Sequence, residues 1–440
     1  MVNKKQSDLV KKIVSLCKRR GIVFQNSEIY GGLAGFYDYG PIGSLTKYNL
    51  KNLWWKTFVL DRSDVVGIDG TIITHPQVWH ASGHVKNFND QLAECKKCHH
   101  RFRTDFITDN KCPDCGGPLT EGRTYNILFE TSIGVVEGEK TKAYLRGEAC
   151  QNIYLNFKNV ADSTRIKVPF GIAQIGKAFR NEVNPKNFLY RVREFEQWDI
   201  EYFVHPDQMD KWYEYWKQTK LNWYQSLVNN SKKIRLRQHT QDELVFYAKK
   251  AFDVEYQAPW GWSEWEGIHW RADYDLSQHS KFSHQDLSYT DPITHQKYIP
   301  HIVETSGGVD RTFFYLLLDA YQEEQLDNGQ TRTYLKLDPR ISAYKICVIP
   351  LASNKEKLVN QAKQIYQQLQ KRYSVDWDDS SNIGKKYRRQ DEIGTPWCLV
   401  VDYQSLEDQT VTIRNRDDMS QIRIDQNKVD QWLTKQLQKN

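Results

Sequence analysis

The chain has 440 residues, of which 39% are hydrophobic and 26% are charged. This size and composition predict an ordinary soluble globular protein with a large core and two or three domains. Its 61 Lys and Arg residues and 55 Asp and Glu residues give a net charge of +6, which permits an acidic partner such as RNA but does not identify one.

Neither a secretion signal nor a membrane span is expected. Residues 1–13 are interrupted too often by charge to form the apolar part of a signal, and no later apolar run is long enough to cross a bilayer. We therefore expect a cytoplasmic location.

Two Cys-x-x-Cys pairs follow in chain order, Cys95 with Cys98 and Cys112 with Cys115. Thirteen residues separate the pairs, a spacing that suits four thiolates around a tetrahedral zinc ion. Because four protein ligands leave no open position for a substrate, we expect the zinc site to be structural. Two disulfides are the alternative, but a chain without a secretion signal favours the metal.

The remaining candidate ligands have weaker patterns. His99 and His100 could each replace one thiolate, although we expect both to be exposed bystanders. Four cysteines lack partners at ligand spacing and are predicted to be buried or incidental thiols: Cys17, Cys150, Cys347 and Cys398.

A strand-to-turn region rich in small residues covers residues 129–152 and includes Glu148 and Gln151. Its composition is typical of the wall of a substrate pocket. A glutamate that caps a turn is the alternative interpretation of Glu148.

A charged hairpin is predicted next, between apolar runs at residues 169–179 and 199–204. Arg180 and Arg191 could neutralise a triphosphate with planar guanidinium groups, Phe195 could stack on a base, and Glu182 could accept from an exocyclic amine. These residue types in this order favour a nucleotide site. A solvated hairpin with exposed ion pairs is the alternative.

Two glycines at residues 307–308 lead into an apolar helix over residues 312–320, with Arg311 at its beginning. An arginine at the positive end of a helix dipole adds to an anion site. A glycine turn that caps a buried helix explains the turn but leaves Arg311 unexplained.

The pattern changes after a polar stretch at residues 322–332, which we interpret as a candidate linker. Strands are predicted at residues 345–349, 374–377, 397–402 and 410–414, and helices at 355–371 and 429–438. This alternation predicts a separate α/β domain that begins near Asp338 and Pro339. Its candidate RNA phosphate contacts are Lys385, Lys386, Arg388 and Arg389, with a solvated helix face as the alternative for each.

The hairpin pattern Phe-Arg-x-Glu, loop, Arg-x-x-x-Phe-x-x-x-Asp at residues 179–199 resembles motif 2 of the class II aminoacyl-tRNA synthetases. Residues 27–41, 66–69 and 75–84 resemble the dimeric glycyl-tRNA synthetases in particular, and residues 75–84 are similar to their motif 1. Residues 301–311 resemble motif 3, and the likeness continues to the C-terminus. An ordered series of this kind is far more specific than one short motif.

The resemblance implies an α+β catalytic domain built on an antiparallel class II synthetase sheet, with a small zinc-binding insert and a C-terminal α/β anticodon-binding domain. We expect the catalytic domain at residues 1–337, its zinc insert at about 92–120, and the anticodon-binding domain at 338–440. It also implies a homodimer, with the subunits paired around a proline that matches Pro76.

The implied activity is ATP-dependent attachment of glycine to tRNA(Gly) through a glycyl-adenylate, with Mg²⁺ on the phosphates and no editing domain. Arg180, Glu182 and Arg311 are the implied catalytic residues. The implied ATP contacts are Arg180, Glu182, Arg191, Phe195, Arg271, Glu304 and Arg311, where Glu304 helps to hold Mg²⁺. The implied glycine contacts are Glu148, Gln151, Asp199 and Ser306.

Several positions depart from the family pattern. Asp199 stands where glycyl enzymes usually carry glutamate, and four neighbours of Glu148 are replaced, including a proline by Gly147. His269 and His279 are expected to be scaffold histidines rather than bases. A non-catalytic paralogue that binds nucleic acid, or a ligase for another small amino acid, are the alternative functions.

Overall fold

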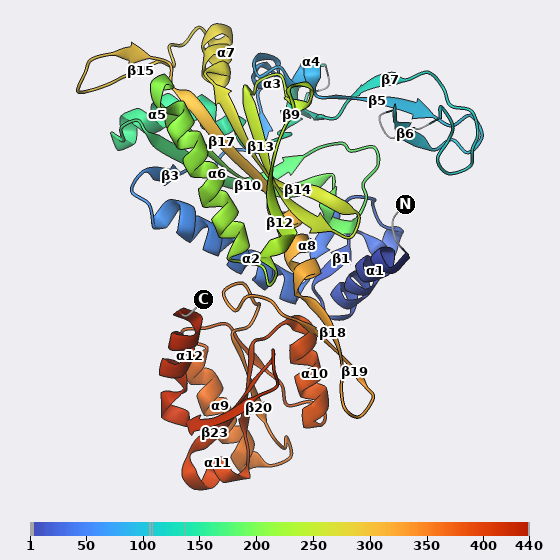
Figure 1. Cartoon of the computed structure of the whole chain (residues 1–440), viewed down its shortest axis with the longest axis vertical. Coiled ribbons are helices and arrows are strands. Elements are labelled where there is room, and N and C mark those ends of the chain that lie inside the picture. Colours follow the sequence, from blue (N-terminus) through green and yellow to red (C-terminus); the bar gives the residue numbers. More distant parts are fainter. Residues whose placement is uncertain (1–3, 105–106, 108, 137, 439–440) are drawn as a thin grey trace.

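The structure is a computed structural model that describes residues 4–104, 107, 109–136 and 138–438, with side chains from residue 8 onward. Residues 1–3 of the charged N-terminal segment and residues 105, 106 and 108 of the predicted zinc insert lie outside the described residues. Figure 1 shows a large N-terminal part, a smaller part that holds the C-terminus, and an arm that projects from the large part.

A seven-stranded sheet forms the centre of the large part. Its neighbouring strands are antiparallel except for the parallel edge pair β10 and β3. The order is β12 (Ile234–Gln238), β13 (Lys250–Ala258), β14 (Gly261–Ala272), β17 (His301–Gly308), β11 (Glu194–Val204), β10 (Phe170–Phe179) and β3 (Val65–Gly67).

Helices cover both faces of this sheet because successive side chains of a strand point to opposite faces. On β11, Tyr202 packs in one apolar core with Trp216 of α6 (Met209–Gln225), whereas Phe203 packs in another with Phe157 of α5 (Gln151–Thr164). Figure 1 shows α6 lying along the sheet. The same alternation places Asp199 on the face of Phe203, toward α5.

The other elements of the large part surround this sheet. The helices are α1 (Lys4–Arg19), α2 (Pro41–Trp55), α3 (Pro76–Ala81), α4 (His84–Asn87), α7 (Tyr274–Ser283) and α8 (Val309–Ala320). Small sheets pair β1 (Val23–Gln25) with β2 (Tyr37–Tyr39), β15 (Tyr289–Thr290) with β16 (Lys297–Tyr298), and β4 (Ile73–Thr74) with β9 (Thr141–Leu145) and β8 (Phe129–Ile133). The projecting arm contains β5 (Asn89–Glu94), β6 (Arg101–Arg103) and β7 (Arg123–Asn126).

The C-terminal part confirms the predicted alternation of strands and helices to within two residues at each end. Its mixed sheet has the order β21 (Val375–Trp377), β20 (Ile346–Pro350), β22 (Trp397–Val401), β23 (Thr410–Asn415) and β24 (Gln421–Asp425). Its helices are α9 (Glu356–Leu369), α10 (Ile383–Ile393), α11 (Tyr403–Asp408) and α12 (Val429–Gln438). Strand β24 and helices α10 and α11 are additions to the predicted elements.

Residues 322–332 are not a polar linker, which corrects the sequence expectation. They form most of a hairpin of β18 (Tyr321–Gln325) and β19 (Thr331–Leu335). Arg332 is only 7% exposed, and its Nε donates to Asp391 of α10 at 2.8 Å. Arg414 of β23 donates to the same carboxylate at 2.9 Å. Arg20, just after α1, also pairs with Glu392 of α10, so two elements of the large part are tied to that helix.

Candidate active site

The predicted strand-loop-strand is confirmed as β10, a loop and β11, with Phe179 opposite Glu194 in the register. Arg180 follows β10 directly, and its Nε donates to the Gly147 carbonyl at 2.9 Å. Its guanidinium lies 5.4 Å from the ring centre of Phe195. The backbone therefore fixes Arg180 beside the aromatic ring that was predicted to stack on a base.

A cavity of about 190 Å³ brings together most of the predicted nucleotide contacts. Arg311, the third residue of α8, pairs with Glu264 at 2.9 Å and lies 4.9 Å from the ring centre of Tyr190. Glu182 Oε2 is buried without a hydrogen bond, and Arg191 lies 3.9 Å from it. The predicted residues that line the cavity are Arg180, Glu182, Arg191, Phe195, Ser306 and Arg311.

Next to this cavity, the neighbouring strands β11 and β17 carry several acidic side chains. Asp199 of β11 lies opposite Ser306 of β17, and Glu201 lies opposite Glu304. Asp199 and Glu201 are fully buried, and neither carboxylate accepts a hydrogen bond of ordinary geometry from the described residues. A buried carboxylate without a partner is costly in water-free surroundings, so this pocket suits a cationic ligand.

The electrostatics of Asp199 reflect that missing partner. Burial raises the pKa of its carboxyl well above the ordinary value, and repulsion from Glu304 and Glu148 adds to the rise, although the Ser306 hydroxyl and Arg146 oppose it. Asp199 therefore takes up a proton readily unless a positive group is supplied.

Glu148 has the opposite behaviour. Burial alone would raise the pKa of its carboxyl, but the charge and hydrogen bond of His84, with the charge of Arg271, hold that pKa well below its usual range. Gln151 is the first residue of α5, and its Nε2 donates to Glu148 Oε1 at 2.9 Å. Its Oε1 lies 2.9 Å from His279 Nε2. Gln151 and His279 thus support Glu148 rather than lying free in the pocket.

The burial and partners of Arg271 do not favour the direct phosphate or substrate contact that the resemblance implies. Arg271 is 1% exposed and donates to Asp275 at 2.7 and 2.8 Å and to Glu304 Oε1 at 2.9 Å. Glu304 Oε2 is engaged in turn by His269 at 2.7 Å. One oxygen of Glu304 is thus held by Arg271, and the other lies near His269 but makes no hydrogen bond of ordinary geometry with the described residues.

Gln197 and Glu264 are among the cavity residues that were not identified from sequence. Gln197 donates to Ser306 Oγ and accepts from the Ala149 amide at 3.2 Å, so it joins the cavity to the turn that carries Glu148. Its position in motif 2, two residues before Asp199 on the same strand face, was the available signal.

The four predicted zinc ligands come together in the projecting arm. The sulfur atoms of Cys95, Cys98, Cys112 and Cys115 all lie within 4.8 Å of one another. The two shortest separations, Cys95 to Cys115 at 3.5 Å and Cys98 to Cys112 at 3.6 Å, are far longer than a disulfide bond. Amides of Cys98 and Lys97 donate to Cys95 Sγ and lower the pKa of that thiol to about 6. This donor set fits zinc.

The basic residues of α10 divide into two groups. Lys385 and Arg388 are exposed. Lys386 is fully buried and donates to the Pro350 carbonyl at 2.8 Å, so it does not fit a phosphate contact, and that expectation is corrected. Arg389 is held by Asp378 at 2.6 and 2.8 Å.

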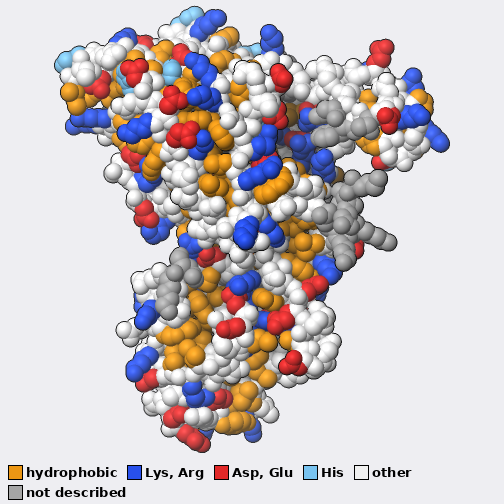
Figure 2. All heavy atoms as spheres, viewed as in Figure 1, with side chains coloured by type: hydrophobic (Ala, Val, Ile, Leu, Met, Phe, Trp, Pro, Cys, Tyr) orange, Lys and Arg blue, Asp and Glu red, His pale blue; other side chains and the backbone are white. Residues whose placement is uncertain are grey.

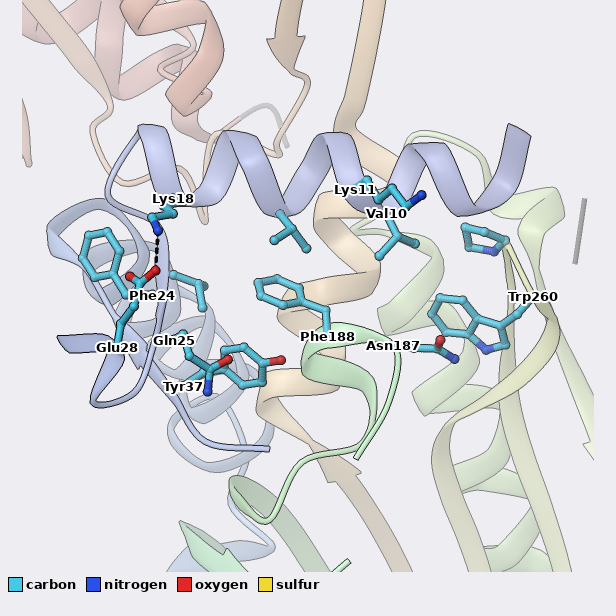
Figure 3. A pocket seen from close by; sticks show the side chains of 13 residues that line it. Val10, Lys11, Lys18, Phe24, Gln25, Glu28, Tyr37, Asn187, Phe188 and Trp260 are labelled. Atoms are coloured by element: carbon cyan, nitrogen blue, oxygen red, sulfur yellow. Dashed lines mark hydrogen bonds and ion pairs between the residues drawn. The ribbon is translucent and has the colours of Figure 1, made fainter. Parts of the chain in front are cut away.

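An apolar hollow of about 590 Å³ lies on the other side of the motif 2 loop. Figure 3 shows Val10 and Lys11 of α1 on one side of it and Phe188 and Trp260 on the other. None of its lining residues belongs to the predicted site, so the nucleotide cavity and this hollow are distinct.

Comparison with known families agrees with this geometry. Residues 131–321 match the family described as "tRNA synthetase class II core domain (G, H, P, S and T)", and residues 345–436 match "Anticodon binding domain". The antiparallel sheet, with its motif 2 hairpin and motif 3 helix around one cavity, defines a class II aminoacyl-tRNA synthetase core.

Individual relatives narrow the class. A glycine–tRNA ligase of Borrelia garinii subsp. bavariensis is 49% identical over 418 residues, which cover 94% of each chain. Those of Treponema denticola and Thermobifida fusca are 48% and 46% identical, over 94% and 98% of this chain and 94% and 99% of their own. The chain belongs to the glycine–tRNA ligase family.

Proposed function

We propose that this chain attaches glycine to tRNA(Gly) in two steps, through a glycyl-adenylate, with release of pyrophosphate and then AMP. The observation that carries the proposal is the junction of two sites. A cavity lined by three arginines lies next to the buried carboxylates of Asp199 and Glu201, which accept no hydrogen bond of ordinary geometry from the described residues. A triphosphate fits the first and an ammonium group fits the second.

ATP occupies the cavity that motifs 2 and 3 share. Arg180, Arg191 and Arg311 neutralise the phosphates, and Phe195 stacks on the adenine. The buried Oε2 of Glu182, which has no hydrogen bond from the described residues, accepts from the exocyclic amine of the base. Mg²⁺ enters with ATP as part of the substrate.

For that cation, we revise the expected carboxylate from Glu304 to Glu264. Glu264 lines the cavity with a side chain that is 49% exposed. Glu264 is paired with Arg311 but faces the cavity, whereas Glu304 is 3% exposed and lies against Arg271 and His269.

Glycine lies with its ammonium group between Glu148 and Asp199, near Ser306. A positive group there offsets the repulsion between these carboxylates, which reduces the cost of keeping Asp199 ionised and buried. A filled pocket rejects the methyl group of alanine by steric overlap, so no editing step is needed.

The chemistry needs no side-chain nucleophile. An oxygen of the glycine carboxylate attacks the α-phosphorus in line, the bond to the bridging oxygen breaks, and pyrophosphate leaves with its electron pair. The terminal ribose hydroxyl of tRNA then attacks the glycyl carbonyl and displaces AMP. The arginines stabilise negative charge that builds up on the phosphates, and the pocket fixes the attacking oxygen.

The four cysteines of the arm hold a structural Zn²⁺. We propose that residues 1–337 form the catalytic domain, with the insert at about 92–120, and that residues 338–440 bind the anticodon. Separate apolar cores support the division, since one ends at Ile341 and the next begins at Ile346.

We propose Lys385 and Arg388 as tRNA phosphate contacts. On the face in Figure 2 basic and acidic side chains are mixed, so the charge there does not single out an RNA surface. A homodimer around Pro76 and a cytoplasmic location remain parts of the proposal. None of the helices that the structure describes has both the length and the apolar character needed to span a membrane.

ATP–pyrophosphate exchange tests the proposal. Purified protein is assayed with glycine, alanine, serine or no amino acid, each with and without tRNA. Exchange with glycine alone is expected. Exchange with alanine or serine would reassign the pocket to another amino acid, and silence under every condition would favour a non-catalytic paralogue.

A further inference from the structure

One oxygen of the Glu148 carboxylate has polar partners on three different residues. His84 Nε2 lies 3.1 Å from Oε1, Gln151 Nε2 donates to it at 2.9 Å, and Cys150 Sγ donates at 3.0 Å. Among the residues that the structure describes, no hydrogen bond or ion pair reaches Oε2. The carboxylate is thus pinned at one oxygen, and the other is left for a ligand.

His84 is the donor that comes from outside the turn that carries Glu148. It is the first residue of α4, it is 2% exposed, and its ring meets the edges of Trp79 and Phe88 with centres 5.3 and 5.1 Å away. Ser82 Oγ lies 2.8 Å from His84 Nδ1. This contact orients the imidazole ring so that Nε2 faces Glu148.

The three donors differ in strength. The thiol of Cys150 is a weak donor, and the amide of Gln151 is neutral. A ring N–H that donates to a carboxylate is a stronger and more directional constraint, especially in a site shielded from water.

We propose that His84 is a positioning residue for the amino acid. It holds Glu148 Oε1 so that Oε2 faces the ammonium group of glycine. This inference rests on the proposed function, because it takes glycine as the ligand of Glu148. His84 itself touches neither substrate nor reacting atoms, and its influence passes through the orientation of one carboxylate.

The test uses the full-length protein in ATP–pyrophosphate exchange, with KM measured separately for glycine and for ATP. His84→Leu keeps a buried side chain of similar bulk and removes the donor, whereas His84→Gln keeps an N–H at a similar reach. We expect His84→Leu to raise the glycine KM about tenfold or more, with the ATP KM within about twofold of wild type. We expect His84→Gln to restore the glycine KM to within about threefold.

The matched control is Cys150→Ala, which removes the weak donor to the same oxygen and should raise the glycine KM less than about threefold. A rise equal to that of His84→Leu would overturn the proposal, because any loss of packing around Glu148 would then have the same effect. So would an unchanged glycine KM in His84→Leu, or a parallel rise in both KM values.

If His84→Leu does not fold, Ser82→Ala provides the same test through the orientation of the His84 ring. We expect a glycine KM about threefold higher with the ATP KM unchanged, and no change would overturn the proposal. Failure of the proposed function is distinguishable, since it would appear as no glycine-dependent exchange in the wild type.

Discussion

Asp199 offers the sharpest test of the amino-acid pocket, because function and stability should respond in opposite directions. The substitution Asp199→Asn keeps the size of the side chain and removes its charge. In the free protein that charge is fully buried and lacks a hydrogen bond of ordinary geometry from the described residues. Its removal should leave the free protein as stable as wild type or about 1–2 kcal/mol more stable.

Glycine binding should weaken in the same variant. Loss of one partner of a buried charge pair costs about 3–5 kcal/mol. At about 1.36 kcal/mol per factor of ten, we expect kcat/KM for glycine in ATP–pyrophosphate exchange to fall by at least about a hundredfold.

The pH dependence follows from the raised folded-state pKa of Asp199. Folded wild type binds this proton more tightly than the unfolded chain does. The stability gained from the proton is therefore complete below the ordinary value of 3.8 and is lost as the pH rises through the raised folded value. The stability of Asp199→Asn relative to wild type should grow over that interval.

A second buried aspartate provides the matched control. Asp275 is also fully buried, but it accepts two hydrogen bonds from Arg271 at 2.7 and 2.8 Å. Asp275→Asn should therefore destabilise the protein by about 3 kcal/mol or more. Urea unfolding at several pH values compares the two variants. Equal destabilisation of both, or an unchanged glycine kcat/KM in Asp199→Asn, would refute the reasoning.

Three further predictions concern the other parts of the proposal. Arg180→Ala should lower glycine-dependent pyrophosphate exchange by about a thousandfold, because a charge-assisted phosphate contact and its stack on Phe195 are both lost; near-normal exchange would contradict the motif 2 assignment. Elemental analysis should find one zinc per chain, and a metal-free wild type would refute the site. Cys115→Ser should lower the thermal stability or the tRNA charging rate while affecting ATP–pyrophosphate exchange less. Arg388→Ala should raise the KM for tRNA severalfold without affecting exchange, whereas Lys386→Ala, which empties a buried position, should lower stability; the reverse pattern would show that the exposure of these two residues was misassigned.

Local patterns in the sequence were sufficient for the parts of the fold that depend on neighbours along the chain. The motif 2 hairpin and the C-terminal strands follow from runs of apolar and β-prone residues between polar turns. The helix after Gly308 begins at Val309, three residues earlier than the predicted start at residue 312, so its first turn contains Asp310 and Arg311.

Long-range partners explain what the sequence did not predict. Arg271 and Lys386 have the side chains of surface residues, and only the folded chain supplies the buried Glu304 and the Pro350 carbonyl that hold them. Residues 322–332 have a linker-like composition. Their role in the fold could not be predicted, because the carboxylate that pairs with Arg332 lies 59 residues away, at Asp391. His84 gave no signal, since its contact with Glu148 joins two turns far apart in the chain.

The hairpin of β18 and β19 has a practical consequence for dissecting the protein. A chain cut at residue 337 would keep Arg332 and Arg20 but lose Asp391 and Glu392, the carboxylates on α10 that they contact. The isolated N-terminal fragment would then expose a hairpin in which Arg332 keeps its ion pair with Glu324 but has lost the buried one with Asp391. The two parts should therefore unfold in one cooperative transition. The proposed anticodon-binding part and the proposed catalytic part should then have the same thermal unfolding midpoint.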